Sequence, residues 1–152
     1  FGGCRTSKNQ RRSTSGLLVN VNGNCVHWRC HVQRTPTLST CESELVSAVE
    51  GGQEIMFVQN LLSEFFKVTK PSILHCDNQC TIKIHDDSHY TGRLNHIDLK
   101  YHWLRHVCHD KGTIKMRYIN TKDNISDIFT KNLPKPQFDN LVSKFMFRQN
   151  LS

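Results

Sequence analysis

Three acidic residues, Glu44, Asp77 and Asp127, occupy positions from which carboxylates could bind a metal ion. Each flanks or follows an apolar stretch, so its side chain can be held rigidly at the edge of a core while its oxygens stay free. Carboxylate oxygens are the ligands that hard divalent cations prefer in proteins. Together the three acids predict most of a metal-binding cluster and make the chain a candidate nuclease.

The first acid, Glu44, is predicted to lie on the opening turn of a long helix. Residues 39–42 match a capping box and predict a helix over 39–66. Glu42 could share a metal ion with Glu44, but its place in the capping box favours a structural role. The pair Gly51-Gly52 costs a helix about 1 kcal/mol per residue relative to alanine. It therefore marks close packing, a kink or simple weakness.

The other two acids are also predicted to lie at the ends of elements. Asp77 follows a buried strand over residues 72–76, and ligands of open α/β sheets bind outside the carboxyl ends of the strands. Asp123 is the expected cap of a helix over residues 124–132, with Asp127 near its start. All three acids can therefore converge on one end of a sheet.

The remaining segments predict an α/β fold, a mixed sheet with helices packed against it. Asn22-Gly23 between two short apolar runs is a strong hairpin signal. At this length one domain over residues 1–152 suffices, with a core over 1–133 and a helical tail over 134–152. Further expected elements are a short helix over 79–85, a polar loop over 86–94, a helix over 95–108 and a strand over 113–119.

Composition limits the classes of protein to which the chain can belong. Its 152 residues are 22% charged and 37% hydrophobic, which is ordinary for a soluble domain. It contains no apolar run near the roughly 18 residues that cross a bilayer, so no membrane partner is expected. The net charge of +7 favours a polyanionic partner, with a solvated basic face as the alternative. Without an initiator Met or a signal-peptide pattern, the chain is expected to be a fragment of a longer protein.

The seven cysteines are odd in number and lie mostly in apolar stretches, which favours reduced thiols in an intracellular protein. Their spacing does not match the paired-cysteine knuckles of structural zinc sites. Ordinary packing or solvated positions are also favoured over a metal site for the histidines at helical spacing. Trp28 and Phe57 are expected in the core rather than as platforms for stacked bases. The residues weighed for metal sites are Cys25, Cys30, His31, Cys76 and Cys80, and then His102, His106 and His109.

Five short motifs follow one another along nearly the whole chain. In this order they resemble the ribonuclease H domain of copia-type retrotransposon Pol polyproteins, whose elements carry long terminal repeats. The resemblance implies a ribonuclease H-like fold truncated at its N-terminus, with the first strand missing. The motifs are RRSTSG at 11–16, STCESE at 39–44, CDNQ at 76–79, NHIDLKYH at 95–102 and SDIFTK at 126–131.

The resemblance implies hydrolysis of the RNA strand of RNA/DNA hybrids by two Mg²⁺ ions, or Mn²⁺, held by four carboxylates. One ion would activate water and the other would stabilise the leaving 3′ oxygen. Glu44, Asp77 and Asp127 take the positions of three metal-binding catalytic residues. The fourth, an Asp on the first strand, is expected just before Phe1. The chain alone is therefore expected to be nearly inactive, and a non-catalytic nucleic-acid-binding remnant is the alternative.

The resemblance also implies partners and a cellular location. An RNA/DNA hybrid would be the nucleic-acid partner, and a reverse transcriptase domain would lie upstream in the same polyprotein. The expected location is intracellular, either cytoplasmic in a virus-like particle or nuclear. A zinc-stabilised interaction module remains a third reading. The residues expected to contact the hybrid are Arg11, Arg12, Ser13, Thr14, Ser15 and Asn78, for which a polar strand entry and a turn are the alternatives.

Overall fold

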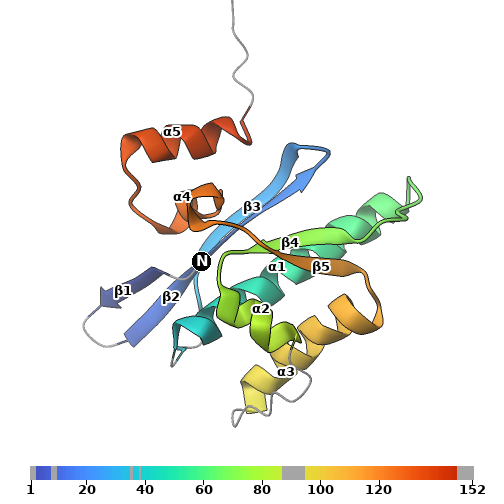
Figure 1. Cartoon of the computed structure of the whole chain (residues 1–152), viewed down its shortest axis with the longest axis horizontal. Helices are drawn as coiled ribbons and strands as arrows, with labels where there is room; N and C mark the ends of the chain where they lie inside the picture. Colours follow the sequence, from blue (N-terminus) through green and yellow to red (C-terminus); the bar gives the residue numbers. More distant parts are fainter. Residues whose placement is uncertain (1–2, 8–9, 35, 38, 87–94, 147–152) are drawn as a thin grey trace, which may run out of the picture.

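Two small β-sheets share one long helix in the computed structural model of the chain (Figure 1). The predicted mixed α/β class is confirmed, but the strands form two sheets rather than one. The structure describes residues 3–7, 10–34, 36–37, 39–86 and 95–146, with side chains at 12–34, 36–37, 39–83 and 99–146.

The first sheet is antiparallel and contains β1 (Gly3–Ser7), β2 (Gln10–Val21) and β3 (Asn24–Val32) in that order. The turn between β2 and β3 has positive φ at both Asn22 (52°) and Gly23 (83°). Two such residues define the type I′ turn that matches the twist of a two-residue hairpin. The predicted hairpin is therefore confirmed, whereas β1 has no counterpart among the predicted elements.

The second sheet pairs β4 (Ser72–Cys76) in parallel with β5 (Ile114–Tyr118). Both strands were expected from the sequence. Parallel strands need a crossover, and α2 (Gln79–Asp86) and α3 (Asn95–Arg105) provide it. The polar loop expected over 86–94 falls mostly outside the described residues, and its first residue ends α2.

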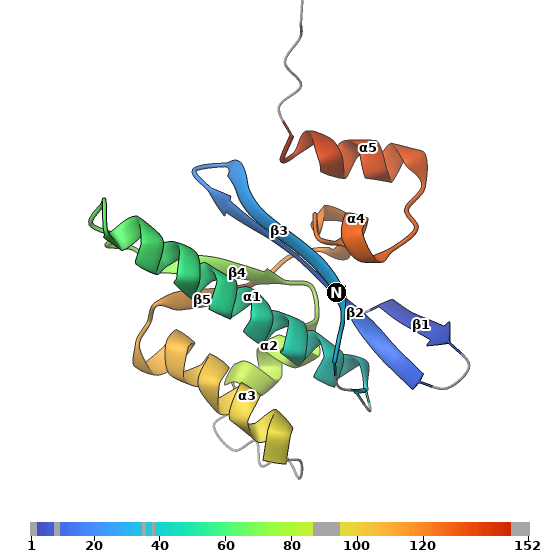
Figure 2. The same cartoon turned by 180° about the vertical axis from the view of Figure 1, so that it is seen from behind.

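Helix α1 (Thr40–Ser63) packs against both sheets, and Figure 2 shows it in front of the strands. Its N-terminus is capped as predicted, because the Ser39 hydroxyl accepts a hydrogen bond from the Glu42 N–H at 3.1 Å. A Cβ on Gly52 would lie 3.1 Å from the Trp103 ring, and one on Gly51 would lie 3.2 Å from Leu74. Of the three explanations for this glycine pair, the structure supports close packing.

A hydrophobic core lies between α1, α3 and the second sheet. A π-helical turn over His106–Asp110 extends α3, so the helix expected over 95–108 is close to the observed one. Trp28 and Phe57 were expected in the core but are 63% and 64% exposed, so that prediction is wrong. The buried core residues are Leu45, Ala48, Val49, Ile55, Tyr101, Leu104, Val107 and Ile114.

The helix predicted over 124–132 is much shorter than expected. A 3₁₀ turn (Thr121–Asp123) precedes α4 (Asp127–Thr130), and α5 (Lys135–Ser143) follows. The Asn124 side chain accepts a hydrogen bond from the Ser126 N–H at 3.2 Å, which forms a turn and delays the helix. Asp123 is not its cap and instead pairs with Lys144 at 2.6 Å.

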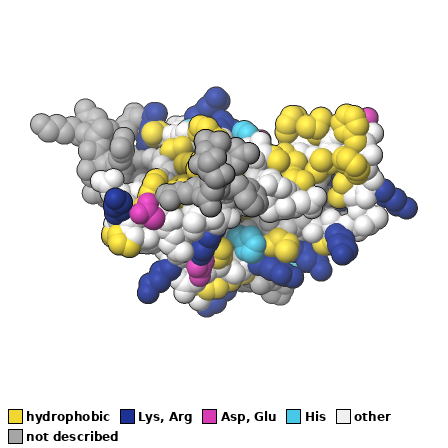
Figure 3. Space-filling model, turned by 90° about the horizontal axis from the view of Figure 1, so that it is seen from above, with side chains coloured by type: hydrophobic (Ala, Val, Ile, Leu, Met, Phe, Trp, Pro, Cys, Tyr) yellow, Lys and Arg dark blue, Asp and Glu magenta, His cyan; other side chains and the backbone are white. Residues whose placement is uncertain are grey.

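The described helices and the exposed surface bear on two expectations from composition. None of these helices combines the length and the apolar character that a membrane span requires. The six cysteines with described side chains are free thiols. Figure 3 shows Lys and Arg side chains at several separate places on one face, so charge alone does not outline a binding surface there.

Candidate active site

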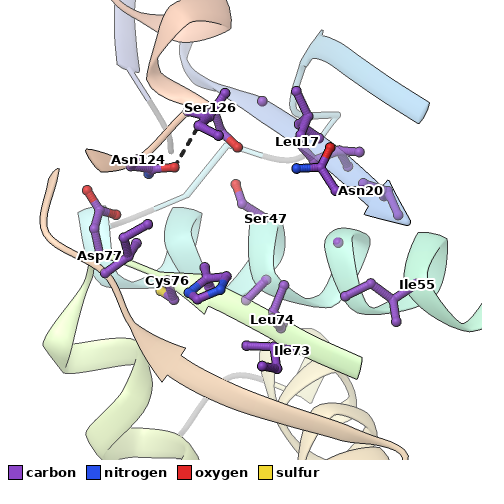
Figure 4. A pocket seen from close by; sticks show the side chains of 18 of the residues that line it. Leu17, Asn20, Ser47, Ile55, Ile73, Leu74, Cys76, Asp77, Asn124 and Ser126 are labelled. Carbon is purple, nitrogen blue, oxygen red and sulfur yellow. Dashed lines mark hydrogen bonds between the residues drawn. The ribbon is translucent and has the colours of Figure 1, made fainter. Parts of the chain in front are cut away.

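A cavity of about 170 Å³ lies between β2 and β4, and side chains of α1 reach it from one side (Figure 4). Two of the three predicted acids, Glu44 and Asp77, line it. Asn124 and Ser126, which lie within three residues before the third acid, line it as well. Three separate segments of the chain therefore bring polar groups to one place.

Asp77 lies just beyond the carboxyl end of β4, as the sequence predicts. Figure 4 shows its side chain pointing from the strand end toward Asn124. Its Oδ2 atom is buried and has no hydrogen-bond partner within the described part of the chain. A buried carboxylate oxygen without a partner is costly, so such an atom is suited to a cation or another donor.

Glu44 lies near the start of α1 and is only 4% exposed. The pKa of the neighbouring Cys76 thiol is raised to about 11, mainly by burial, and the charges of Glu44 and Asp77 contribute to that rise. Both carboxylates therefore act on one thiol at the end of β4. This shared effect places Glu44 and Asp77 in one electrostatic environment.

Asp127 opens α4 and is 1% exposed. Its Oδ2 atom pairs with Lys131 Nζ at 2.8 Å, and its Oδ1 atom accepts a long hydrogen bond from Asn124 at 3.5 Å. Burial raises the pKa of Asp127, Lys131 acts in the opposite direction, and the charge of Asp77 adds to the rise. The charge of Asp77 is therefore felt at Asp127.

The three carboxylates fit a divalent cation only in part. Their oxygens are the ligands that Mg²⁺ and Mn²⁺ prefer, and the Oδ2 atom of Asp77 has no hydrogen-bond partner in the described structure. Lys131, however, already neutralises Asp127. Within the described ranges, no three His, Cys, Asp or Glu side chains are grouped closely enough to hold a metal ion. The metal-binding role of these acids stays a prediction.

Two of the serines expected at the nucleic acid instead face the interior. Ser15 is 1% exposed, and its hydroxyl lies 2.9 Å from the Ser47 hydroxyl and accepts a hydrogen bond from Gln33 Nε2 at 3.0 Å. Ser13 is buried as well, with its hydroxyl 3.4 Å from that of Thr37. As placed here, neither hydroxyl is available to a nucleic acid. Ser15 thereby links β2 to α1, and Ser13 links β2 to the segment that precedes α1.

The other residues expected at the nucleic acid have mixed settings. Arg12 and Thr14 are partly exposed, and the buried Nε atom of Arg12 has no partner in the described structure. The side chain of Arg11 lies outside the described residues. Asn78 accepts hydrogen bonds from the N–H groups of Cys80 (2.8 Å) and Thr81 (3.3 Å), so it caps α2. That capping role matches the turn alternative considered for Asn78.

Three features near the cavity were not singled out as functional from the sequence. Trp28 stacks on Phe129 with ring centroids 6.1 Å apart and planes 12° apart, forming an exposed aromatic surface beside α4. Gly16 lets α4 approach β2, since a Cβ there would lie 2.7 Å from Thr130 Cγ2. Gln33 is buried and binds the first turns of α1. Of these three features, only the position of Trp28 has a signal in the sequence: the alternation of side chains along β3 places it on the face opposite His27 and Arg29.

Comparison with known proteins finds relatives of one kind over most of the chain. It is 33% identical over 129 residues to the retrovirus-related Pol polyprotein from transposon TNT 1-94 of Nicotiana tabacum, and 27% identical over 133 residues to that from transposon RE1 of Arabidopsis thaliana. These alignments cover 85% and 87% of this chain. A shorter match, 48% identical over 48 residues, is to secreted RxLR effector protein 161 of Plasmopara viticola and covers 32% of this chain and 34% of that protein.

The matched polyproteins are much longer than this chain, which spans only about a tenth of their length. No protein-family model matches the chain. No solved structure matches it either. The relationship of this chain to known proteins therefore depends on its sequence similarity to the Pol polyproteins and to the secreted effector protein.

Proposed function

We propose, because the homologues of this chain are retrovirus-related Pol polyproteins of plant transposons, that it is the ribonuclease H-like domain of such a polyprotein. Its family activity would be metal-dependent hydrolysis of the RNA strand of RNA/DNA hybrids. A reverse transcriptase domain upstream in the polyprotein would deliver that hybrid. Three carboxylates without a fourth should support little turnover, so the chain alone would be nearly inactive.

One observation carries the proposal. Glu44, Asp77 and Asp127 stand in motifs 33 or more residues apart, yet Glu44 and Asp77 line one cavity and Asp77 acts on the pKa of Asp127. Each acid stands near the end of a different element, which is how rigid scaffolds hold catalytic side chains. Carboxylates serving only as helix caps would have no reason to gather.

Magnesium suits the oxygen donors of Glu44, Asp77 and Asp127, which would hold it. When bound, magnesium supplies positive charge beside the scissile phosphate and lowers the pKa of an attacking water. Asp77 offers an unpaired oxygen for this purpose. Lys131 neutralises the buried charge of Asp127 while no metal ion is bound. For Asp127 to bind a metal ion, the ammonium group of Lys131 would have to release one of its carboxylate oxygens.

A second function, a non-catalytic nucleic-acid-binding remnant, is favoured by one specific observation. The pairing of Lys131 with Asp127 at 2.8 Å removes the most buried acid from the set of open ligands. Such a remnant would bind the phosphates of a hybrid through its basic residues, because cations bind phosphates. Its exposed Trp28 surface would stack on unpaired bases at the ends or single-stranded extensions of the hybrid. It would show no specific cation site.

Manganese titration of the ¹⁵N-labelled chain separates the two functions. For the ribonuclease H-like domain, we expect paramagnetic Mn²⁺ to broaden the amide signals of Glu44, Asp77 and Asp127 first. Asp77→Asn should raise the Mn²⁺ concentration needed for that broadening at least tenfold, because even the loss of a partner outside the ligand shell weakens metal affinity by roughly 10 to 100-fold. The matched control is Asp139→Asn, a substitution of an exposed acid on α5.

Binding and cleavage are then measured with a labelled RNA/DNA hybrid and a DNA duplex of the same sequence. The proposal predicts preference for the hybrid and only trace Mn²⁺-dependent cleavage, which Asp77→Asn abolishes. Hybrid binding without selective broadening would favour the remnant. Equal affinity for both duplexes, together with unselective broadening, would refute the ribonuclease H-like assignment. Robust turnover by the chain alone would refute the expected impairment.

A further inference from the structure

Two cysteine side chains meet where α1 packs against α2. Cys41 is the second residue of α1, and Cys80 is the second residue of α2. Figures 1 and 2 both show α2 beside the N-terminal turns of α1, and the two helices are in direct contact. The thiol of Cys41 interacts with the thiol of Cys80 through a hydrogen bond. Helix packing therefore brings together two thiols that lie far apart in the sequence.

The connection from β4 to α2 holds Cys80 in place. The Cys76 thiol donates to the Asn78 carbonyl at 3.7 Å. The Asn78 side chain in turn accepts hydrogen bonds from the N–H groups of Cys80 at 2.8 Å and Thr81 at 3.3 Å, which orders the first turn of α2. Thr81 is fully buried and lies beside the Cys41 thiol. The start of α2 is therefore anchored against the start of α1.

The two thiols differ in their access to solvent. Cys80 is exposed, whereas Cys41 is half-buried. Burial, together with the neighbouring Cys80 thiol, raises the pKa of the Cys41 thiol to about 12. Cys41 therefore keeps its proton and donates the shared hydrogen bond, and the Cys80 sulfur accepts it. A dissolved oxidant meets the exposed Cys80 first, with a second sulfur beside it.

We infer that Cys41 and Cys80 are a modification site, at which a reversible disulfide bond clamps α1 to α2. Cys41 precedes Glu44 by three residues and Cys80 follows Asp77 by three, so the bond would tie together the elements that carry these acids. It would close a loop of about 40 residues, which restricts the unfolded chain and stabilises the fold. The bond needs neither a metal ion nor a nucleic acid, so it forms or fails to form independently of the proposed function.

A low-molecular-weight disulfide such as oxidised glutathione is the oxidant. The Cys80 thiolate attacks one glutathione sulfur, which breaks the glutathione S–S bond and releases one glutathione thiolate. The Cys41 sulfur then attacks the Cys80 sulfur of this mixed disulfide and releases the second glutathione. The two cysteines lose two electrons and two protons, and the two glutathione molecules receive them. Because Cys41 keeps its proton near neutral pH, the second step is slow and equilibrium takes hours.

A titration of the whole chain with mixtures of oxidised and reduced glutathione tests the bond. The remaining thiols are alkylated, and the digested chain is analysed by mass spectrometry, in which mixed disulfides with glutathione are recognised by their added mass. In the oxidised chain we expect a peptide that joins Cys41 to Cys80 and a fall in free thiols from seven to five. The oxidised chain should also unfold at a higher urea concentration than the reduced chain. Excess dithiothreitol should reverse all three changes.

Single substitutions identify the two sulfurs. Cys41→Ser and Cys80→Ser should each abolish the joined peptide and the shift in urea midpoint. Cys30→Ser is the matched control and should leave both unchanged, because Cys30 is exposed like Cys80 but its thiol donates to the Phe129 carbonyl.

Two results would overturn the assignment. One is the presence of only mixed disulfides with glutathione at every ratio. The other is a bond from Cys80 to Cys76, the cysteine that lies nearest to it in the sequence. Fragmentation of the joined peptide locates the bonded sulfurs in the parent chain itself, so the experiment is decided even if a variant does not fold.

Discussion

Substitution of Gly16 by alanine should loosen α4 from β2 and disturb the position of Asp127. A Cβ at residue 16 would lie 2.7 Å from Thr130 Cγ2, 3.0 Å from the Ser126 carbonyl oxygen and 3.2 Å from Phe129 Cβ. The Thr130 methyl group can rotate away, but the Ser126 carbonyl belongs to the backbone and cannot. The segment that carries Asp127 must therefore shift by a few tenths of an ångström.

The size of the effect follows from two opposing contributions. Forcing extra atoms into a packed contact costs about 1–3 kcal/mol. Replacing glycine by alanine also restricts the unfolded chain, which stabilises the fold by about 0.4–1 kcal/mol. The expected net loss in the free energy of unfolding is about 1–2 kcal/mol, measured by urea denaturation followed by circular dichroism.

Gly51→Ala is the matched control and should act in the opposite direction. Gly51 lies inside α1, where alanine is favoured over glycine by about 1 kcal/mol. Its added Cβ would meet only Leu74 Cδ1, the end of a flexible side chain, at 3.2 Å. We expect unchanged or higher stability. The packing argument fails if Gly16→Ala is as stable as the parent chain, or if Gly51→Ala is the less stable of the two variants.

Three further predictions concern buried polar groups. Gln33→Ala removes the two N–H donors of Nε2, which are shared among Ser15, Ser43 and Ser47, and should cost about 2–3 kcal/mol in urea denaturation. A loss below about 0.5 kcal/mol would contradict this role. Lys131→Ala leaves the buried Asp127 without its cationic partner and should lower the free energy of unfolding by about 1–3 kcal/mol. Lys144→Ala removes the partner of Asp123 in an exposed ion pair and should lower it by less than about 1 kcal/mol. Equal losses in the two variants would show that the burial of Asp127 does not matter. Burial raises the pKa of Asp127, so its carboxyl group stays protonated to a higher pH in the folded chain than in the unfolded chain. The contribution of Asp127 to stability therefore falls as pH rises from about 4, its pKa in the unfolded chain, toward its pKa in the folded chain. The melting temperature of Asp127→Asn relative to the parent should therefore rise between pH 4 and pH 7, and a flat or falling difference would contradict the raised pKa.

The parts of the fold that were predictable from sequence are those with local causes. Asn22-Gly23 determines a hairpin because both positions accept positive φ, and Ser39 begins α1 because its hydroxyl caps a nearby N–H group. Both signals act within a few residues. For the same reason, the position of Asp77 at a strand end could be inferred from an apolar run followed by polar residues.

The parts that sequence did not reveal depend on distant partners. Ser15 is buried because Gln33 and Ser47 bind its hydroxyl, and neither partner is close in sequence. Trp28 is exposed because α4, a hundred residues further on, covers only part of it. Burial of a polar residue and exposure of an aromatic one both depend on which segment packs there, and local periodicity does not encode that choice.

The stacking of Trp28 on Phe129 gives the chain a built-in optical reporter. The chain contains two tryptophans, and Trp103 packs instead against Gly52 and the core. Fluorescence from Trp28 therefore follows the docking of α4 on β3, whereas fluorescence from Trp103 follows the packing of α3 on α1. In Trp103→Phe, a change in emission at a lower urea concentration than the loss of helical ellipticity would show that the segment bearing Asp127 opens before the rest of the fold.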